Sequence, residues 1–184
     1  MSQPLAKSDY KRLVPSLILD HALAVLGSLL VIGFLGAWSN WFMMLICNIL
    51  SCAMLLVFPY HECWQAGSYD YNYQKMGKGE IRMKRGIIAG LLACIPSLLI
   101  ALFAMICAIT GWMPGTLFDQ NLAEFLYRGW FLPVSFFFPL LARSSAWYLL
   151  PVVLMPISAT IGYVLGSKQI FLRDIFVYQR DKTK

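Results

Sequence analysis

The chain of 184 residues is 59% hydrophobic and 13% charged, with a mean hydropathy of +0.65 and a formal net charge of +6. Soluble domains are about half apolar and about a quarter charged, so this composition excludes an ordinary water-soluble domain. Most of the 15 Lys and Arg lie in three short blocks separated by long apolar runs. We therefore expect a lipid bilayer to be the solvent and the apolar runs to be membrane spans.

The first predicted span covers about residues 14–37 and is interrupted by Asp20 and His21. Basic residues precede it, and Ala37 and Ser39 stand where a signal peptide would be cleaved. The apolar run is longer than the roughly 7–15 residues of a signal peptide and carries two ionisable side chains. We expect it to be retained as a span.

The second predicted span covers about residues 41–67 and leads into the most polar stretch of the chain, YHECWQAGSYDYNYQKMGKGEIRMKRG. The start of this stretch resembles the zinc motif H-E-x-x-H, but its fifth position is Gln65 and the chain has only two His. The five cysteines all lie in or beside apolar runs, without zinc or disulfide spacing. We predict no metal, no cofactor and no catalytic motif.

The aromatic residues of this stretch suit the headgroup layer of a membrane better than a ligand cage. Trp64, Tyr69, Asp70 and Asn72 form a candidate interfacial site, with Asp70 and Asn72 expected at a turn or helix end. The basic residues that follow are expected to fix the topology and to contact anionic lipid headgroups. Loops this short offer little surface for nucleic acid, and we expect none to bind.

The third predicted span covers about residues 86–112 and contains rows of small residues that favour close helix packing: Gly86, Gly90 and Cys94, with Ala89, Ala93, Ser97 and Ala101 beside them. Pro96 should bend this helix, because proline removes one backbone hydrogen bond. The fourth predicted span covers about residues 147–166, with Pro151 in its first turn and a bend at Pro156.

Between these two spans lies an apolar stretch of about residues 130–141 that contains Pro133 and Pro139. It is shorter than the roughly 20 helical residues that cross a bilayer. We expect an external segment that is interfacial or re-entrant, with five spans as the alternative. Basic residues flank spans on the cytoplasmic side, so the blocks around Lys11, Lys78 and Lys182 predict that both ends are cytoplasmic.

The sequence thus predicts an all-α fold, a polytopic bundle of four transmembrane helices in a single membrane domain of residues 1–184, with a cytoplasmic tail at 167–184. Placing an ionisable group inside a membrane span costs free energy, so such a group indicates a functional site or a buried contact. If the second helix runs past Pro59, Asp20 would pair with His61, or His21 with Glu62. Asn48 would add a hydrogen bond between helices. These residues either lock helices together, reach headgroups, or form a proton or substrate relay.

The function that we expect follows from two features of the sequence: its loops are short, and it contains no recognisable set of catalytic residues. We expect a small protein of the cytoplasmic membrane that acts as an accessory or self-assembling subunit, with a membrane-protein partner or further copies of itself. The alternative is a small oligomeric transporter or channel built around Asp20, His21, Asn48, His61 and Glu62. A membrane-embedded enzyme is the third alternative.

Overall fold

The computed structural model describes residues 10–35, 41–77, 81, 84–110, 120–138 and 144–170. Within these residues all regular secondary structure is helical and no strand occurs, so the predicted all-α class is confirmed. The elements are α1 (Tyr10–Leu35), α2 (Trp41–Lys75), α3 (Lys84–Ala93), α4 (Ile95–Thr110), α5 (Gln120–Trp130), the 3-10 helices η1 (Leu132–Phe137) and η2 (Ser145–Val153), and α7 (Leu154–Ser167).

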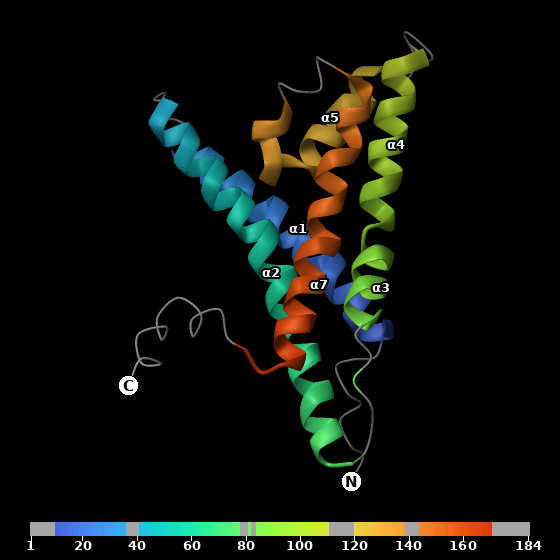
Figure 1. Cartoon of the computed structure of the whole chain (residues 1–184). Helices are drawn as coiled ribbons and strands as arrows, with labels where there is room; N and C mark the ends of the chain where they lie inside the picture. The colour runs from blue at the N-terminus through green and yellow to red at the C-terminus, as the bar shows by residue number, and fades with distance from the viewer. Residues whose placement is uncertain are drawn as a thin grey trace.

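Three of the described helical stretches are long and apolar enough to cross a membrane: Tyr10–Phe34, Trp41–Lys75 and Ala146–Ser167. A fourth crossing results if α3 and α4, which are bent by 47° at the break between them, are taken as one span. In Figure 1 the hairpin of α1 and α2 leans away from α4 and α7 toward one end, and α5 and η1 occupy the space between them. At the opposite end α2, α3 and α7 converge.

The break between α3 and α4 confirms the bend predicted at Pro96. The turn at Cys94 separates the two helices, and its carbonyl accepts a hydrogen bond from Leu98 N–H at 2.8 Å. Pro96 has no N–H with which to continue the pattern. The fourth span begins differently from the expectation: residues 145–153 are a 3-10 helix that contains Pro151, and Pro156 lies in the first turn of α7, where a missing N–H is tolerated.

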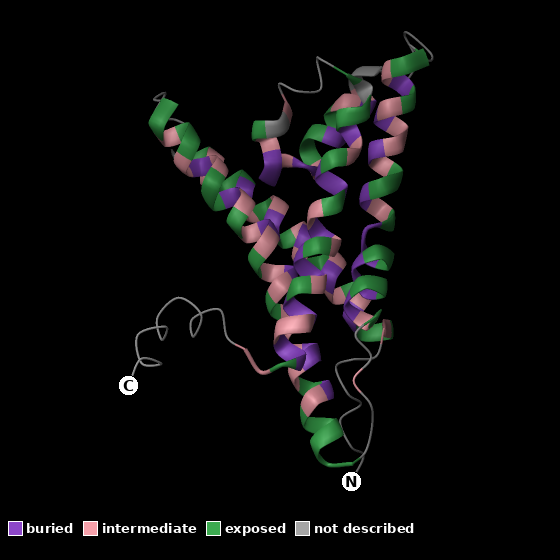
Figure 2. Ribbon diagram, in the orientation of Figure 1, coloured by how far each residue is buried: buried purple, intermediate pink, exposed green. Residues whose placement is uncertain are grey.

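Small side chains fill the interior of this molecule and large apolar ones cover its outside. Figure 2 shows the buried positions gathered where α2, α3 and α7 meet. Many of them are alanine or cysteine: Ala24, Cys63, Ala66, Ala89, Ala93, Ala101, Ala104, Cys107 and Ala159. Leu30, Phe34 and Ile49 are more than half exposed. Helices that pack within lipid place small residues inward and large ones outward, because moving a leucine from lipid into the protein interior gains no hydrophobic free energy.

Glycine brings α7 against α2 and α3 at backbone distance. A Cβ at Gly166 would lie 2.8 Å from the carbonyl carbon of Trp64 on α2, and one at Gly162 would lie 3.0 Å from that of Tyr60. On α3, a Cβ at Gly90 would lie 2.8 Å from Cα of Pro156. The row Gly86–Gly90 predicted as a packing surface is confirmed, and the surface that it contacts is α7.

Candidate functional site

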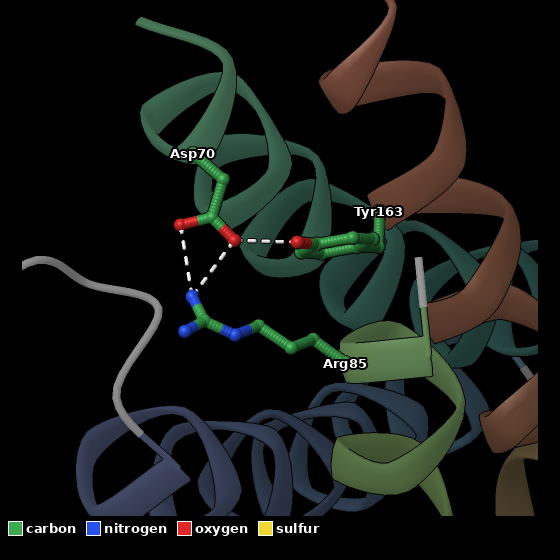
Figure 3. A network of polar contacts seen from close by, with 3 residues as sticks. All are labelled: Asp70, Arg85 and Tyr163. Carbon is green, nitrogen blue, oxygen red and sulfur yellow. Dashed lines mark hydrogen bonds and ion pairs between the residues drawn. The ribbon is translucent and has the colours of Figure 1, made fainter. Parts of the chain in front are cut away.

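The first polar cluster joins three helices at the end of the bundle where α3 begins (Figure 3). Arg85 Nη1 on α3 donates to both carboxylate oxygens of Asp70 on α2, at 3.1 Å to Oδ1 and 3.0 Å to Oδ2. The hydroxyl of Tyr163 on α7 donates to the same Oδ2. Asp70 is only 6% exposed. A buried carboxylate is tolerated when its charge is paired and its lone pairs are bonded, and here both conditions are met.

This position of Asp70 corrects the prediction of a turn or helix end. The helix α2 continues to Lys75, so Asp70 lies one turn inside it and faces the bundle. Of the four residues predicted as an interfacial site, Trp64 also contacts the α7 end, because its Nε1 donates to the carbonyl of Ile170 at 3.0 Å. Tyr69 and Asn72 are exposed and do not join the cluster.

The second polar cluster lies midway along α1 and is centred on Trp130, the last residue of α5. His21 Nε2 donates to the carbonyl of Trp130 at 3.1 Å, since a carbonyl oxygen can only accept. The two rings also stack, with centroids 4.7 Å apart. On the other side, Trp130 Nε1 donates to Ser97 Oγ on α4 at 2.8 Å. Trp130 therefore ties the hairpin of α1 and α2 to α4.

Asn48 meets the same segment one turn further along. Ser135 Oγ on η1 donates to Asn48 Oδ1 on α2 at 2.5 Å. The predicted hydrogen bond from Asn48 therefore exists, with η1 rather than another long helix as its partner. The segment is also held by its apolar side chains, since Tyr127, Phe131 and Val134 are fully buried. The Tyr127 hydroxyl donates to the carbonyl of Tyr148 at 3.1 Å.

These contacts fix the position of the segment 120–138 along α4. Ser97, which holds Trp130, lies roughly 20 Å along α4 from Thr110, its last residue, at about 1.5 Å per residue. The hydrocarbon layer of a bilayer is about 30 Å thick. The described segment 120–138 therefore lies beside α4 about 20 Å away from the end of that helix, and it precedes η2 in the chain.

The predicted pairs of Asp20 with His61 and of His21 with Glu62 are not made. His21 uses Nε2 for Trp130, and His61 Nε2 lies 2.7 Å from Gln65 Nε2 on its own helix. The side chain of His61 is exposed, so it faces outward from the bundle. Asp20 Oδ2 and His21 Nδ1 are buried without a hydrogen-bond partner among the described residues. Asp20 nevertheless lies within electrostatic range of both His61 and Glu62.

Two cavities open on either side of η1, and Asn48 lines both. One of about 390 Å³ lies between α1, α2 and η1 and is lined by Ile32, Met44, Cys47, Asn48, Leu132 and Ser135. The other, of about 450 Å³, follows the outer face of α2 and is lined by Leu45, Asn48, Ile49, Cys52, Ala53, Leu56 and Phe136. We call the second cavity the α2 groove.

In the part of the chain that the structure describes, no group of three or more His, Cys, Asp or Glu lies close enough to hold a metal ion. Comparisons of the chain with protein-family models, with curated proteins and with solved structures found no match. The arrangement of the described side chains joins helices: one cluster fixes the α2, α3 and α7 ends, and the other fixes the segment 120–138.

Proposed function

We propose that this chain is a protein of the cytoplasmic membrane with four spans, both termini in the cytoplasm, and a re-entrant segment at 120–138 that enters from outside. The four spans are α1, α2, the bent pair α3 and α4, and η2 with α7. The position of the basic residues supports this topology: Lys11 at the start of α1, Lys75 at the end of α2, Lys84 at the start of α3 and Lys168 after α7 stand at one end of the bundle (Figure 1). Basic residues at one end of every span are typical of a cytoplasmic face.

Its function is that of an accessory or self-assembling subunit of a membrane complex. The observation that carries this proposal is the side-chain amide of Asn48. One end of the amide is bonded to Ser135, and the other end has no hydrogen-bond partner among the described residues; Asn48 and Ser135 together line the cavity between α1, α2 and η1, whereas the α2 groove is lined by apolar atoms only. Exchange of the amide oxygen and nitrogen would leave one end without a partner in either orientation. In hydrocarbon an amide without a hydrogen-bond partner raises the free energy of the protein. Association with a helix from another chain that offers such a partner is therefore favoured.

The surroundings of Asn48 also support a protein partner. Around it the groove offers large apolar side chains, since Leu45 is 46% and Ile49 is 59% exposed. The first half of α2 leans away from α7, and α1 and η1 are the described elements that accompany it there (Figure 1). A helix placed in the groove would gain packing contacts along its length.

The test is purification from membranes in a mild detergent, followed by native mass spectrometry. We expect the wild-type chain to be recovered with further copies of itself or with another membrane protein, and Asn48→Leu to lose this association while remaining folded. Asn72→Leu is the matched control, because Asn72 is exposed and far from the groove. Recovery of wild-type protein only as an unaccompanied monomer would contradict the proposal.

A small oligomeric transporter or channel is the second candidate, favoured by Asp20. Its buried Oδ2 has no hydrogen-bond partner in the described part of the chain, and two further ionisable groups, His61 and Glu62, lie within electrostatic range. An acid of this kind inside a span is by default a site hypothesis. Proton or ion flux into proteoliposomes should fall in Asp20→Asn and in Glu62→Gln. Flux that is absent from wild type, or that is unchanged in both variants, rejects this candidate.

A further inference from the structure

We infer that the cavity between α1, α2 and η1 binds a lipid-soluble alcohol, an uncharged molecule that carries a hydroxyl group on an apolar body. We call this space the η1 cavity; its lining residues are Ile32, Met44, Cys47, Asn48, Leu132 and Ser135. The inference goes beyond the proposed function and does not depend on it. A side-chain amide can form up to four hydrogen bonds, so the amide of Asn48 can bind Ser135, an alcohol and a partner chain together.

The η1 cavity has the size and the walls of a small-molecule site. Its volume is about 390 Å³, and sites for small molecules occupy roughly 300–1,000 Å³. Ile32 of α1, Met44 of α2 and Leu132 of η1 contribute apolar side chains from three different elements. Such walls suit the apolar body of a molecule that reaches the cavity through the membrane.

The lining selects an uncharged molecule. Among the described residues that line the η1 cavity there is no Asp, Glu, Lys, Arg or His. A charged group placed within the hydrocarbon layer needs a partner of opposite charge. A phosphate headgroup, a carboxylate and an ammonium group are therefore poor occupants of this cavity.

The pair of Asn48 and Ser135 offers both a donor and an acceptor to an occupant. The hydroxyl of Ser135 donates to Asn48 Oδ1 at 2.5 Å, which leaves the N–H groups of Asn48 and the lone pairs of Ser135 Oγ open. If the amide oxygen and nitrogen exchange places, Asn48 donates to Ser135. The open groups are then the amide oxygen of Asn48 and the hydroxyl proton of Ser135. Either orientation leaves one open donor and one open acceptor on neighbouring side chains.

A hydroxyl group matches this pair because a single oxygen atom both accepts and donates. A ketone, an ester or an ether only accepts, and a hydrocarbon does neither. Water forms the same two bonds but has no apolar body to contact the apolar walls. The α2 groove is the comparison: its walls are apolar atoms only, so they do not distinguish an alcohol from the acyl chains of the bilayer.

Native mass spectrometry of the unmodified chain in phospholipid nanodiscs tests the inference with matched probes at equal mole fraction in the bilayer. Farnesol carries the hydroxyl, its methyl ether only accepts, and the hydrocarbon farnesene does neither. We expect a one-to-one adduct with farnesol and roughly tenfold fewer adducts with the ether, because the ether leaves one polar group of the pair without a partner. Dioctanoylglycerol, an alcohol built on a glycerolipid, distinguishes the source: preference for it assigns the natural occupant to glycerolipids, and preference for farnesol assigns it to free alcohols.

Variants locate the bound alcohol. Ser135→Ala removes one member of the polar pair and should abolish the preference for farnesol over its methyl ether. Ser51→Ala is the matched control, because Ser51 is buried on α2 and does not line the η1 cavity, and it should keep the preference. A farnesol analogue with a diazirine should cross-link to Met44 or Leu132. The comparison of probes uses the wild-type chain and does not require either variant to fold.

Equal binding of farnesol and its ether, the absence of a farnesol adduct, or cross-links confined to residues outside the η1 cavity would overturn the inference. The same spectra report association of the chain with further copies or with another protein. Association without a bound alcohol overturns this inference and leaves the proposed function standing. An unaccompanied monomer that binds the alcohol has the opposite meaning.

Discussion

Replacement of Gly166 by alanine should separate two helices that now touch through their backbones. The added Cβ would lie 2.8 Å from the carbonyl carbon and 2.9 Å from the Cα of Trp64. Carbon atoms in contact normally lie about 3.5–4.0 Å apart, so α7 and α2 must part by roughly 1 Å. The obstructing atoms belong to the backbone of a long helix, and no side-chain rotation relieves the overlap.

We expect Gly166→Ala to lower the free energy of unfolding by about 2–3 kcal/mol. Overpacking of a close contact costs about 1–3 kcal/mol. A further contribution arises because Tyr163 lies on the same helix and its hydroxyl donates to Asp70. A hydrogen bond to a charged group contributes about 1.5–3 kcal/mol, part of which is lost when the helices part.

The assay is reversible unfolding in mixed detergent micelles, followed by circular dichroism. Gly33→Ala on α1 is the control, because no atom of the residues that the structure describes lies within 4 Å of a Cβ placed there. Alanine is a better helix former than glycine by about 1 kcal/mol, so the control should be as stable as wild type or slightly more stable. If Gly166→Ala unfolds with the same free energy as Gly33→Ala, the close packing of α2 on α7 is refuted.

Three further changes test the polar clusters. Tyr163→Phe should lower the unfolding free energy by about 1.5–3 kcal/mol, through loss of one hydrogen bond to a charged group, in the same unfolding assay. Asp70→Ala should lower the free energy of unfolding by about 3–5 kcal/mol because it leaves the charge of Arg85 without a partner. A double-mutant cycle with Arg85→Ala that shows no coupling energy would contradict the ion pair. His21→Leu should speed hydrogen exchange in residues 122–136 roughly tenfold, because the segment loses a bond to α1 of about 1.4 kcal/mol; exchange at the wild-type rate would show that His21 does not hold it.

The extent of α2 shows what the local sequence reveals and where it misleads. The prediction ended the second span near Gly67 and placed a turn among the tyrosines that follow. The helix instead runs to Lys75, and Gly77 with φ of 70° terminates it, in the left-handed conformation that glycine adopts easily. Gly67 serves a different purpose, since a Cβ there would lie 2.8 Å from Ser167 N on α7. A glycine in a membrane helix marks a close contact as readily as an end.

The apolar runs and the all-helical class followed from composition, because helices are what apolar runs of this length form in lipid. The partners of the polar residues did not follow. Asp70 is bonded to Tyr163 and His21 to Trp130, and each pair is separated by about half the chain or more. Only packing decides such contacts. One signal was present and missed: Gly162 and Gly166 form a G-x-x-x-G pattern, which is typical of close helix pairs.

The topology of the segment 120–138 is the most direct test of the account, and single cysteines in an otherwise cysteine-free chain measure it. Thr110→Cys and Ser144→Cys flank the segment, while Lys75→Cys and Lys168→Cys mark the opposite end of the bundle; all four native side chains are exposed. A membrane-impermeant thiol reagent added to intact cells should label positions 110 and 144 and leave 75 and 168 unlabelled until the membrane is opened. Labelling of positions 110 and 144 from opposite sides would mean that the segment crosses the bilayer, and equal labelling of all four in intact cells would contradict the membrane-spanning arrangement itself.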